Sequence, residues 1–280
     1  MDIRQSPEYG HYLAQIGWVV EQVSGVNYFI RKFPLVGSII KIQRPEKIDF
    51  EEIEKLTKKY KAFQIILEPI TTRPRSHNLS PSIGSSSSIH NSLYAHKFKL
   101  SKSPYLPTKT LLIDIGLTNF RSDIKRAINK FNNDQFSIYT NNLDQFRNAW
   151  KKAVGLSKYV PSLKQLQALQ NSFKINSLFV TTSDKSAGII FLVSGTTLYY
   201  WQAFSDKKKR YLPNQYRMVW YGILWGKKRG AKLFDFEGIY DERFPNKSWL
   251  GFTHFKKTFG GKEVEYPGCF IKTKTIFSFP

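Results

Sequence analysis

Hydrophobic and polar residues alternate in short blocks through residue 68, which predicts strands and helices in mixed order. Ser6-Pro7 stands before a helical pattern and predicts a short capped helix, because a serine cap and an early proline favour helix starts. Two runs rich in β-branched and aromatic residues, 18–23 and 27–31, flank Ser24-Gly25 and predict a hairpin. The remaining expected elements are a strand at 39–42, an amphipathic helix at 50–60 and a strand at 63–68.

Residues 71–92 are rich in serine, proline and other polar residues and show no hydrophobic periodicity, so we expect a mobile surface insertion there. Regular patterns then resume, and they begin again from about residue 136. The expected elements are a buried strand at 110–115, a basic helix at 120–131, a strand at 136–139, helices at 143–154 and 162–173, strands at 177–182, 187–194 and 196–204, a long aromatic helix at 212–229 that ends at Gly230, and strands at 232–236 and 272–277.

This doubled pattern predicts an α/β (α+β) protein with two successive domains, each containing a mixed sheet. We place the first domain at 1–133 together with 266–280, including the serine-rich insertion at about 71–92, and the second at 134–265. A chain of 280 residues is long enough to bury two separate cores. The last strand is expected to rejoin the sheet of the first domain.

The chain is strongly basic, with 43 Lys and Arg against 21 Asp and Glu and a formal net charge of +22. Hydrophobic residues make up 41% of it, which excludes a wholly disordered polycation because such a chain could not bury enough apolar surface. The charge favours a polyanionic partner, which could be a nucleic acid, an anionic membrane surface or a phosphorylated substrate. Solubility alone, or a cell interior rich in potassium, is the alternative explanation.

Other composition features narrow the class further. A single cysteine, Cys269, excludes a disulfide framework, and the five histidines show no paired metal-ligand spacing, so no metal site is expected. No Walker loop, Rossmann glycine pattern, nucleophile elbow or kinase signature is present, and we expect no cofactor. The apolar runs are shorter than a membrane span and the opening residues lack an apolar signal core. We therefore expect a soluble, cytoplasmic protein with no transmembrane segment.

Asp235 and Glu237 alternate on one face of the strand predicted at 232–236, which suggests an acid–base pair. An exposed strand edge is the simpler explanation of the same spacing. Lys256 stands beside Lys257, and from the residues alone a solvated lysine is the better interpretation.

Three motifs occupy the C-terminal third of the chain: Lys228-Arg229-Gly230 at a helix end, Phe234-Asp235-Phe236-Glu237-Gly238 at a strand end, and Phe255-Lys256-x-x-Phe259-Gly260-Gly261 beyond it. Together they resemble the Fem family, the FemA-, FemB- and FemX-type aminoacyltransferases that build peptidoglycan cross-bridges. The family pattern is Lys/Arg-Gly, then Tyr/Phe-Asp-Phe-Gly-Gly, then Phe-Lys-x-x-Phe-Gly-Gly. Upstream matches at 6–10, 17–18, 103–108, 113–115 and 124–127 make the resemblance colinear over most of the chain.

The resemblance implies two tandem acetyltransferase-like (GNAT-like) acyltransferase domains. It also implies transfer of an amino acid from aminoacyl-tRNA to an amine on the stem peptide of a peptidoglycan precursor, which is either nucleotide-linked or lipid-linked. Both substrates are polyanions and suit the charge of +22. The charge would also suit a peripheral contact with the inner membrane surface.

The resemblance further implies site residues. Lys256 would stabilise negative charge on the ester or on the departing ribose oxygen, beside Phe255, and Asp235 would orient or deprotonate the amine. Candidate substrate contacts are Arg44, Arg210, Tyr216, Arg217, Gly260 and Gly261, and candidate tRNA contacts are Lys207, Lys208, Lys209 and Arg210. Core packing would explain Tyr216, a turn would explain the glycines, and a solvated loop would explain the lysines equally well.

Two departures from the family pattern stand out. Phe236-Glu237-Gly238 replaces the usual pair of glycines, and Arg44-Pro45-Glu46 replaces Arg-Gly-Pro in the first half. Two other functions remain open. A GNAT-type N-acyltransferase with another acyl donor would share the fold, but no pyrophosphate-binding glycine loop stands between a strand and a helix. A non-catalytic basic RNA-binding protein would explain the charge, though not the Phe-Lys-x-x-Phe-Gly-Gly motif.

Overall fold

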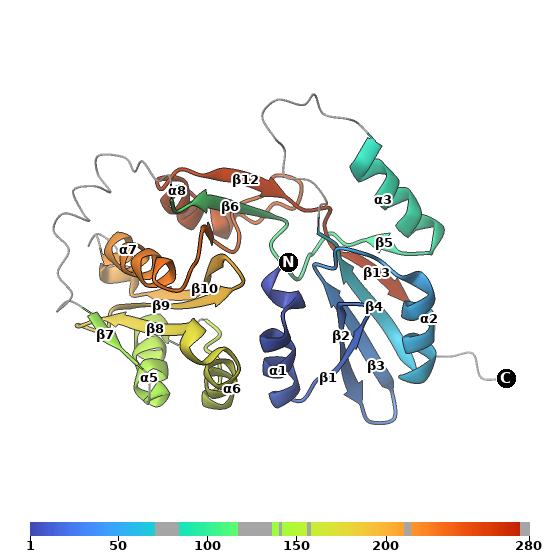
Figure 1. Cartoon of the computed structure of the whole chain (residues 1–280), viewed down its shortest axis with the longest axis horizontal. Helices are drawn as coiled ribbons and strands as arrows, with labels where there is room; N and C mark the ends of the chain where they lie inside the picture. The colour runs from blue at the N-terminus through green and yellow to red at the C-terminus, as the bar shows by residue number, and fades with distance from the viewer. Residues whose placement is uncertain (71–83, 117–135, 140–141, 156–157, 210–213, 275–280) are drawn as a thin grey trace. The chain divides into compact units, whose positions relative to one another are not determined.

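The computed structural model describes residues 1–70, 84–116, 136–139, 142–155, 158–209 and 214–274. The chain forms two compact units, each built on its own mixed sheet (Figure 1). The first comprises Met1–Lys109, Asp241–Asn246 and Val264–Pro280, and the second comprises Thr110–Tyr240 and Lys247–Glu263. The chain enters the second unit earlier than the division that we expected after residue 133. The reason is strand β6 (Lys109–Asp114), which pairs with a strand of the second sheet.

The first unit contains a six-stranded sheet in the order β1-β2-β3-β4-β13-β5. Strands β3 and β4 are parallel, and β13 lies between β4 and β5, antiparallel to both. The last strand of the described residues therefore belongs to the first sheet. The strands are β1 (Val19–Val23), β2 (Val26–Phe33), β3 (Gly37–Gln43), β4 (Ala62–Glu68), β5 (Lys99–Leu100) and β13 (Phe270–Thr273).

Helices cover both faces of this sheet. Helix α1 (Pro7–Gln15) begins after Ser6, whose side chain accepts a hydrogen bond from the backbone N–H of Tyr9, as the sequence predicts. Tyr9 packs edge-on against Phe29 of β2. Helix α2 (Phe50–Lys59) covers the other face, where its Ile53 joins the core formed by the alternate β2 residues Tyr28 and Ile30. The period-2 alternation of β2 thus provides apolar side chains to both faces.

The expectation of an irregular insertion at 71–92 is wrong for its second part. Helix α3 (Gly84–Ala95) begins within it, while 71–83 lie outside the described residues. Leu93 is fully buried and joins the core of the first unit together with Phe98. The packing of this buried leucine stabilises the helix, although the serine-rich composition of the segment does not predict one.

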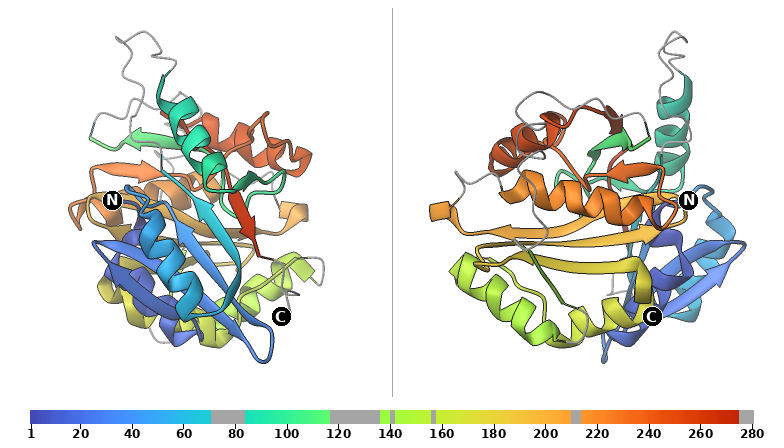
Figure 2. Two further views of the ribbon diagram at one scale, coloured as in Figure 1. Left: turned by 90° about the vertical axis from the view of Figure 1, so that its right-hand side faces the viewer. Right: turned by 60° about the vertical axis from the view of Figure 1, so that its left-hand side comes forward.

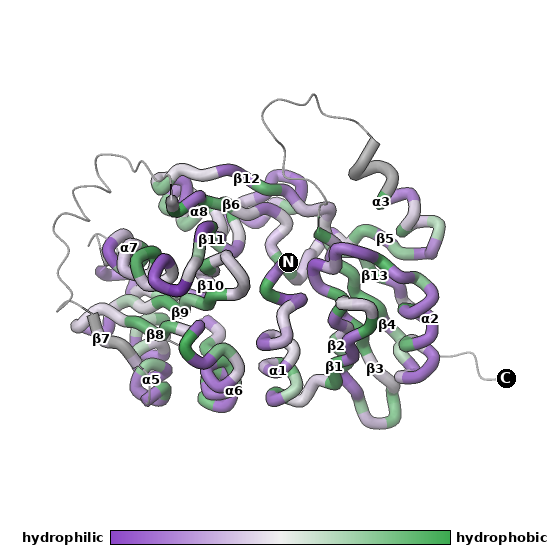
Figure 3. The backbone as a smooth tube through the Cα atoms, in the orientation of Figure 1, coloured by the Kyte–Doolittle hydropathy of each residue, from purple (hydrophilic) through white to green (hydrophobic). Residues whose placement is uncertain are grey.

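The second unit contains a seven-stranded sheet in the order β12-β6-β11-β10-β9-β8-β7. Strands β10 and β11 are parallel, whereas β6–β11, β9–β10, β8–β9 and β7–β8 are antiparallel pairs. Its remaining strands are β7 (Phe136–Ile138), β8 (Ser177–Thr182), β9 (Ala187–Ser194), β10 (Thr197–Ser205), β11 (Leu233–Asp235) and β12 (Lys262–Glu265). Hydrophobic residues concentrate on the central strands (Figure 3).

Helix α7 (Asn214–Lys227) covers one face of the second sheet, and α5 (Leu143–Val154) and α6 (Leu163–Phe173) cover the other (Figures 1 and 2). On the α7 side, Ile223 packs with Phe191 and Phe234. Helix α6 begins with a capping box between Ser162 and Gln165, as its sequence predicts. The basic helix predicted at 120–131 lies outside the described residues.

The close approach of α7 to β9 leads to a first prediction. A Cβ atom at Gly222 of α7 would lie 2.4 Å from the ring of Phe191, which is fully buried and cannot move aside. We expect Gly222→Ala to lower the free energy of unfolding by about 1–2 kcal/mol, because overpacking outweighs the gain in helix propensity. Urea unfolding measures this change. Gly251→Ala is the control: its Cβ meets nothing within 4 Å, and a comparable loss there would contradict the packing explanation.

Candidate active site

Two parallel strands of the second sheet separate at their carboxyl ends. Strands β10 and β11 pair only through Thr197↔Leu233, Leu198↔Phe234 and Tyr199↔Asp235. Strand β11 ends at Asp235, whereas β10 continues to Ser205. In open α/β sheets, ligands bind outside the carboxyl ends of strands where neighbouring strands part. This position is therefore the first place to look for an active site.

Lys256 lies at this position. Its side chain is 7% exposed, and its Nζ donates to the carbonyl oxygens of Phe236, at 2.7 Å, and Gly238, at 2.6 Å. The ammonium also lies 5.4 Å from the ring centroid of Tyr200. Tyr200 and Phe236 directly follow the last paired residues of the two strands. The cation thus occupies the point at which the strands diverge.

Lys256 belongs to helix α8 (Leu250–Lys257), which is not among the elements expected from the sequence. Helical spacing places Thr253 and Lys256 on one face. Thr253 Oγ1 accepts a hydrogen bond from the backbone N–H of Tyr240 at 2.7 Å, so α8 is fastened to the loop after β11 at two points. Lys257 is exposed and forms an ion pair with Glu263 at 2.6 Å.

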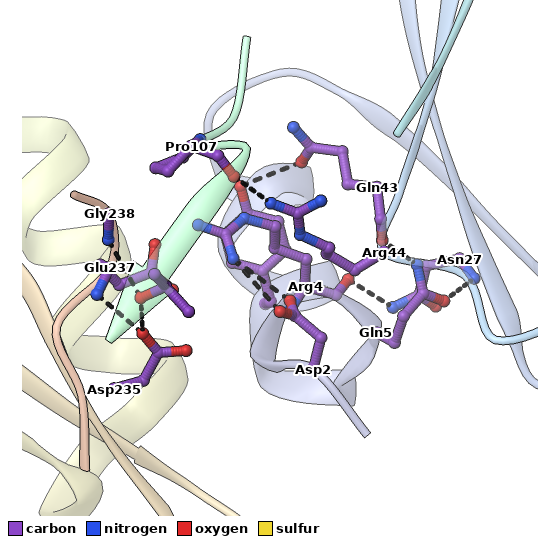
Figure 4. A network of polar contacts seen from close by, with 12 residues as sticks. Asp2, Arg4, Gln5, Asn27, Gln43, Arg44, Pro107, Asp235, Glu237 and Gly238 are labelled. Carbon is purple, nitrogen blue, oxygen red and sulfur yellow. Dashed lines mark hydrogen bonds and ion pairs between the residues drawn. The ribbon is translucent and has the colours of Figure 1, made fainter. Parts of the chain in front are cut away.

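The loop after β11 is held in shape by hydrogen bonds of Asp235 and Thr110. Figure 4 shows Asp235 beside Glu237 and Gly238 of this loop. Asp235 Oδ1 accepts from the Thr110 hydroxyl at 2.5 Å and from the backbone N–H of Glu237 at 2.8 Å. The Thr110 hydroxyl in turn accepts from the backbone N–H of Gly238 at 3.2 Å. Glu237 and Gly238 both have positive φ, 54° and 117°, and this turn brings two carbonyls to Lys256. Asp235 therefore shapes the loop that holds Lys256.

Burial lowers the pKa of Lys256 to about 8, while the charges of Glu237 and Asp235 oppose this shift. The side chain is therefore mostly an ammonium ion at pH 7 but gives up its proton far more readily than an ordinary lysine. Lys256 Nζ has three N–H donors, and hydrogen bonds to the carbonyls of Phe236 and Gly238 account for two of them. A buried cation of this kind can stabilise a developing oxyanion or protonate a leaving oxygen.

Three aromatic rings lie near this cation: the centroids of Phe252, Tyr200 and Phe236 are 4.9, 5.4 and 5.9 Å from Lys256 Nζ. The neighbouring residue Phe255 makes other contacts. Phe255 packs against Tyr216 of α7 and against Phe259, with ring centroids 5.0 and 5.4 Å apart. Tyr216 and Phe255 are half-buried, and both belong to the edge of the core of the second unit. Arg217 is half-buried on the same helix. Core packing thus accounts for the position of Tyr216.

The two glycines of the third motif have different roles. Gly261 has φ +104°, and a Cβ there would lie 2.6 Å from the carbonyl oxygen of Leu112, so this glycine permits close approach to β6. Gly260 has φ +77° and open space around its Cα, and it donates its N–H to the carbonyl of Lys257 as α8 ends. Gly261 therefore allows close contact with the backbone of β6 and not with a ligand, whereas the space beside Gly260 is open.

Arg44 belongs to the first unit and is buried. Its guanidinium stacks on the ring of Tyr266, 3.5 Å from the centroid. It also donates to the carbonyl oxygens of Pro69, at 3.4 Å, and Pro107 (Figure 4). These contacts give Arg44 a structural role that its burial makes hard to combine with the expected substrate contact.

The three expected tRNA-binding lysines form a short 3-10 turn, η5 (Lys207–Lys209), and all three are exposed. Lys209 forms an ion pair with Asp184 at 2.9 Å. Burial of Asp184 works against ionisation, but hydrogen bonds from Thr182, Lys209 and Ser186 hold its pKa well below the usual range. Arg210, expected to contact both the precursor and tRNA, lies outside the described residues.

Sequence reasoning missed Thr110, Thr253 and Tyr200. The interval of three residues between Thr253 and Lys256 is a signal for a shared helix face, but only once 250–257 is identified as a helix. The part of the chain that the structure describes holds no cluster of three or more His, Cys, Asp or Glu suited to a metal ion. No helix among these residues has the length and apolarity needed to span a bilayer.

Comparison with known proteins identifies similar families and folds. The model of the FemAB family matches residues 109–278. The crystal structure of FemX is similar at a TM-score of 0.72 and 14% identity, covering 98% of this chain and 92% of that one. L-PGS from Bacillus licheniformis gives a TM-score of 0.61 at 10% identity, with 94% and 86% covered. A tandem GNAT protein from the clavulanic acid biosynthesis pathway gives 0.54 at 6% identity, with 92% and 83% covered.

These structural likenesses, all at low identity, confirm the predicted α/β fold with tandem GNAT-like domains. No curated protein matches the chain in sequence.

The buried ammonium leads to a prediction about stability. The pKa of Lys256 is about 8 in the folded chain and 10.5 in the unfolded one. Between these values the unfolded state binds more protons, so the contribution of Lys256 to the free energy of unfolding rises with pH. Below pH 8 both states are protonated and the full penalty of burying the charge remains. We expect wild type to gain on the order of 3 kcal/mol relative to Lys256→Met between pH 7 and 10.5.

Urea unfolding of both proteins across this range measures the difference, and the other titrating groups cancel because both proteins contain them. Parallel stability curves for the two proteins would show that the pKa of Lys256 is not lowered.

Proposed function

The chain belongs to the FemAB family, and on this premise we propose that it is an aminoacyltransferase that acts on a peptidoglycan precursor. It would move an amino acid from aminoacyl-tRNA to an amine of the precursor's stem peptide. The observation that carries the proposal is the buried ammonium of Lys256 at the point where β10 and β11 separate. The net charge of +22 supports polyanionic substrates.

In the proposed reaction the amine attacks the carbonyl carbon of the ester that joins the amino acid to tRNA. A C–N bond forms, the ester C–O bond breaks, the ribose hydroxyl leaves with a proton, and the amine loses one. Ester aminolysis is favourable, so positioning and charge stabilisation supply the acceleration. A tetrahedral intermediate with a negatively charged oxygen lies between the two bond changes.

Lys256 would donate its remaining N–H to this oxyanion or to the departing ribose oxygen. Its lowered pKa, about 8, suits proton donation near neutral pH. Asp235 would act as a positioning residue, because its hydrogen bonds shape the loop whose carbonyls hold Lys256. Phe255 would support the position of Lys256 indirectly, because its packing against Tyr216 holds α8 to α7. Gly260, Tyr216 and Arg217 are the proposed substrate contacts of this unit.

A turnover assay with charged tRNA and a precursor tests the proposal. Product formation with aminoacyl-tRNA is the expected result. Product formed only with an acyl-coenzyme A donor would identify an N-acyltransferase of another kind. Binding of tRNA without turnover on either donor would identify a non-catalytic RNA-binding protein.

We expect Lys256→Met to reduce kcat about 10²–10³-fold while the Kd for each substrate changes little, because the lost donor acts on the intermediate. Single-turnover kinetics and equilibrium binding measure the two quantities separately. Lys257→Met is the matched control, since Lys257 is the exposed neighbour paired with Glu263. Equal losses in both variants, accompanied by weaker tRNA binding, would make Lys256 an ordinary phosphate contact.

The exposed lysines of η5 provide a test of tRNA binding. If Lys207 and Lys208 neutralise two phosphates, replacing both with Ala should weaken binding and reduce the log–log salt slope by about 1.4–1.8. Filter binding over a range of salt concentrations measures this slope. The control is the double variant Lys227→Ala and Lys228→Ala, which removes the same charge at the exposed end of α7. An equal change of slope in both pairs would mean that general charge, and no specific cluster, attracts tRNA.

A further inference from the structure

The hairpin between β2 and β3 carries an exposed apolar tip. Phe33 is 39% exposed, Leu35 is 109% exposed and Val36 is 47% exposed, and Pro34 between them is exposed as well. These residues lie at one end of the first sheet, where the hairpin forms the lower loop in Figure 1. The Cα pairing of Phe33 with Gly37 closes the hairpin, so its tip is a defined part of the fold. Apolar side chains held in this way in water need an explanation.

The backbone of the tip does not explain why residue 35 is a leucine. The N–H of Val36 donates to the carbonyl of Phe33 at 3.3 Å, which forms a four-residue turn with Pro34 in its second position. Leu35, in the third position, has φ +65°. That position favours Gly or Asn, and positive φ is unfavourable for a bulky side chain. Leu35 is therefore strained as well as exposed, and neither the turn nor the core requires it.

Lysines lie at the same end of the first sheet as this tip. The Nζ atoms of Lys32 and Lys59 lie over the ring of Tyr60, at 5.3 and 5.2 Å from its centroid. Lys58 and Lys61 are exposed nearby in the chain, and the carbonyl of Lys61 accepts from the N–H of Ser38 at the start of β3. We call Lys32, Lys58, Lys59 and Lys61 the basic rim.

Other groups at this end do not cancel the charge of the basic rim. Glu21 pairs with Lys59 at 2.7 Å and also accepts from the hydroxyl of Tyr60, which neutralises one of the four cations. Lys58 and Lys59 complement the dipole at the end of α2, but Lys32 lies on β2 and has no such role. Phe33 packs against Phe63 at the start of β4, 6.0 Å between ring centroids, so the tip and the rim adjoin.

We propose that residues 33–36 insert into an anionic phospholipid surface, with the basic rim at the level of the headgroups. A short convex apolar tip beside lysines suits the interfacial zone of a bilayer, where apolar side chains enter the acyl boundary and cations meet anionic headgroups. A nucleic acid would be bound by the lysines and would leave Leu35 and Val36 in water. The proposal does not depend on the chemistry at Lys256, and its test contains neither tRNA nor precursor.

Co-sedimentation with vesicles tests the proposal. We expect the wild-type chain to bind vesicles of phosphatidylcholine mixed with phosphatidylglycerol and to bind pure phosphatidylcholine weakly. Leu35→Asn should weaken binding to the anionic vesicles about tenfold, because one leucine no longer leaves water. Asn tolerates positive φ, so the variant should unfold at the same temperature as wild type or a higher one. Lys32→Ala should weaken the same binding about fivefold.

Ile175→Asn is the matched control. Ile175 is 75% exposed and belongs to the second unit, so the change removes a similar apolar side chain that is not part of the hairpin or of its sheet. It should leave vesicle binding unchanged. Wild-type affinity in Leu35→Asn, or equal losses in the two Asn variants, would overturn the proposal. Sedimentation velocity provides a further check: self-association of wild type that disappears in Leu35→Asn would make the tip a contact between copies and would also overturn it.

Discussion

The site of the second unit depends on one interaction, the pairing of the buried ammonium of Lys256 with the carbonyls of Phe236 and Gly238. Burying an unpaired ammonium would be strongly unfavourable, so both acceptors must be in place. Two carbonyls separated by one residue can face the same cation only if the chain between them turns sharply. Positive φ at Glu237 and Gly238 makes this turn. A positive φ at a non-glycine residue such as Glu237 is normally unfavourable, but here the position of the lysine requires it.

The turn is itself supported by neighbouring strands and a helix. Thr110 stands on β6, and its hydroxyl donates to Asp235 and accepts from Gly238. This contact needs β6 beside β11, which explains why β6 belongs to the second sheet although it precedes the expected division at residue 133. Thr253 holds the far end of the loop to α8. The lysine, the loop, a strand and a helix therefore form one cooperative assembly, in which loss of any member would expose or unpair the cation.

Local signals explain how much of the fold could be predicted. Ser6 and Ser162 act through contacts within a few residues, and the helix starts that they predict are present. Helix α3 could not be predicted from local signals, because its residue Leu93 is buried in a core built largely from distant parts of the chain. The position of Lys256 was missed for a similar reason. The helix that contains it has no side-chain cap at its start and is held by contacts with the loop beyond β11, at Tyr240 and at the carbonyls of Phe236 and Gly238.

The motif Phe255-Lys256-x-x-Phe259-Gly260-Gly261 contains residues with structural roles and one residue with a chemical role. Phe255 and Phe259 pack on Tyr216, Gly260 ends the helix, and Gly261 lets the chain pass against β6. Only Lys256 directs a reactive group toward the separating strands. The aromatic and glycine positions were therefore identifiable as a pattern from sequence. What each one does depends on contacts with α7 and β6 that no spacing reveals.

The departure at Glu237 changes the electrostatics of the site. The family pattern has glycine here, and this chain places a carboxylate at a residue with φ +54°. Burial lowers the pKa of Lys256, and the charge of Glu237 is the strongest influence in the opposite direction, followed by that of Asp235. A glycine would relieve the backbone but would leave burial less opposed, and the pKa of the ammonium would fall further. Glu237 thus combines an unfavourable backbone conformation with a charge that favours the protonated state of Lys256.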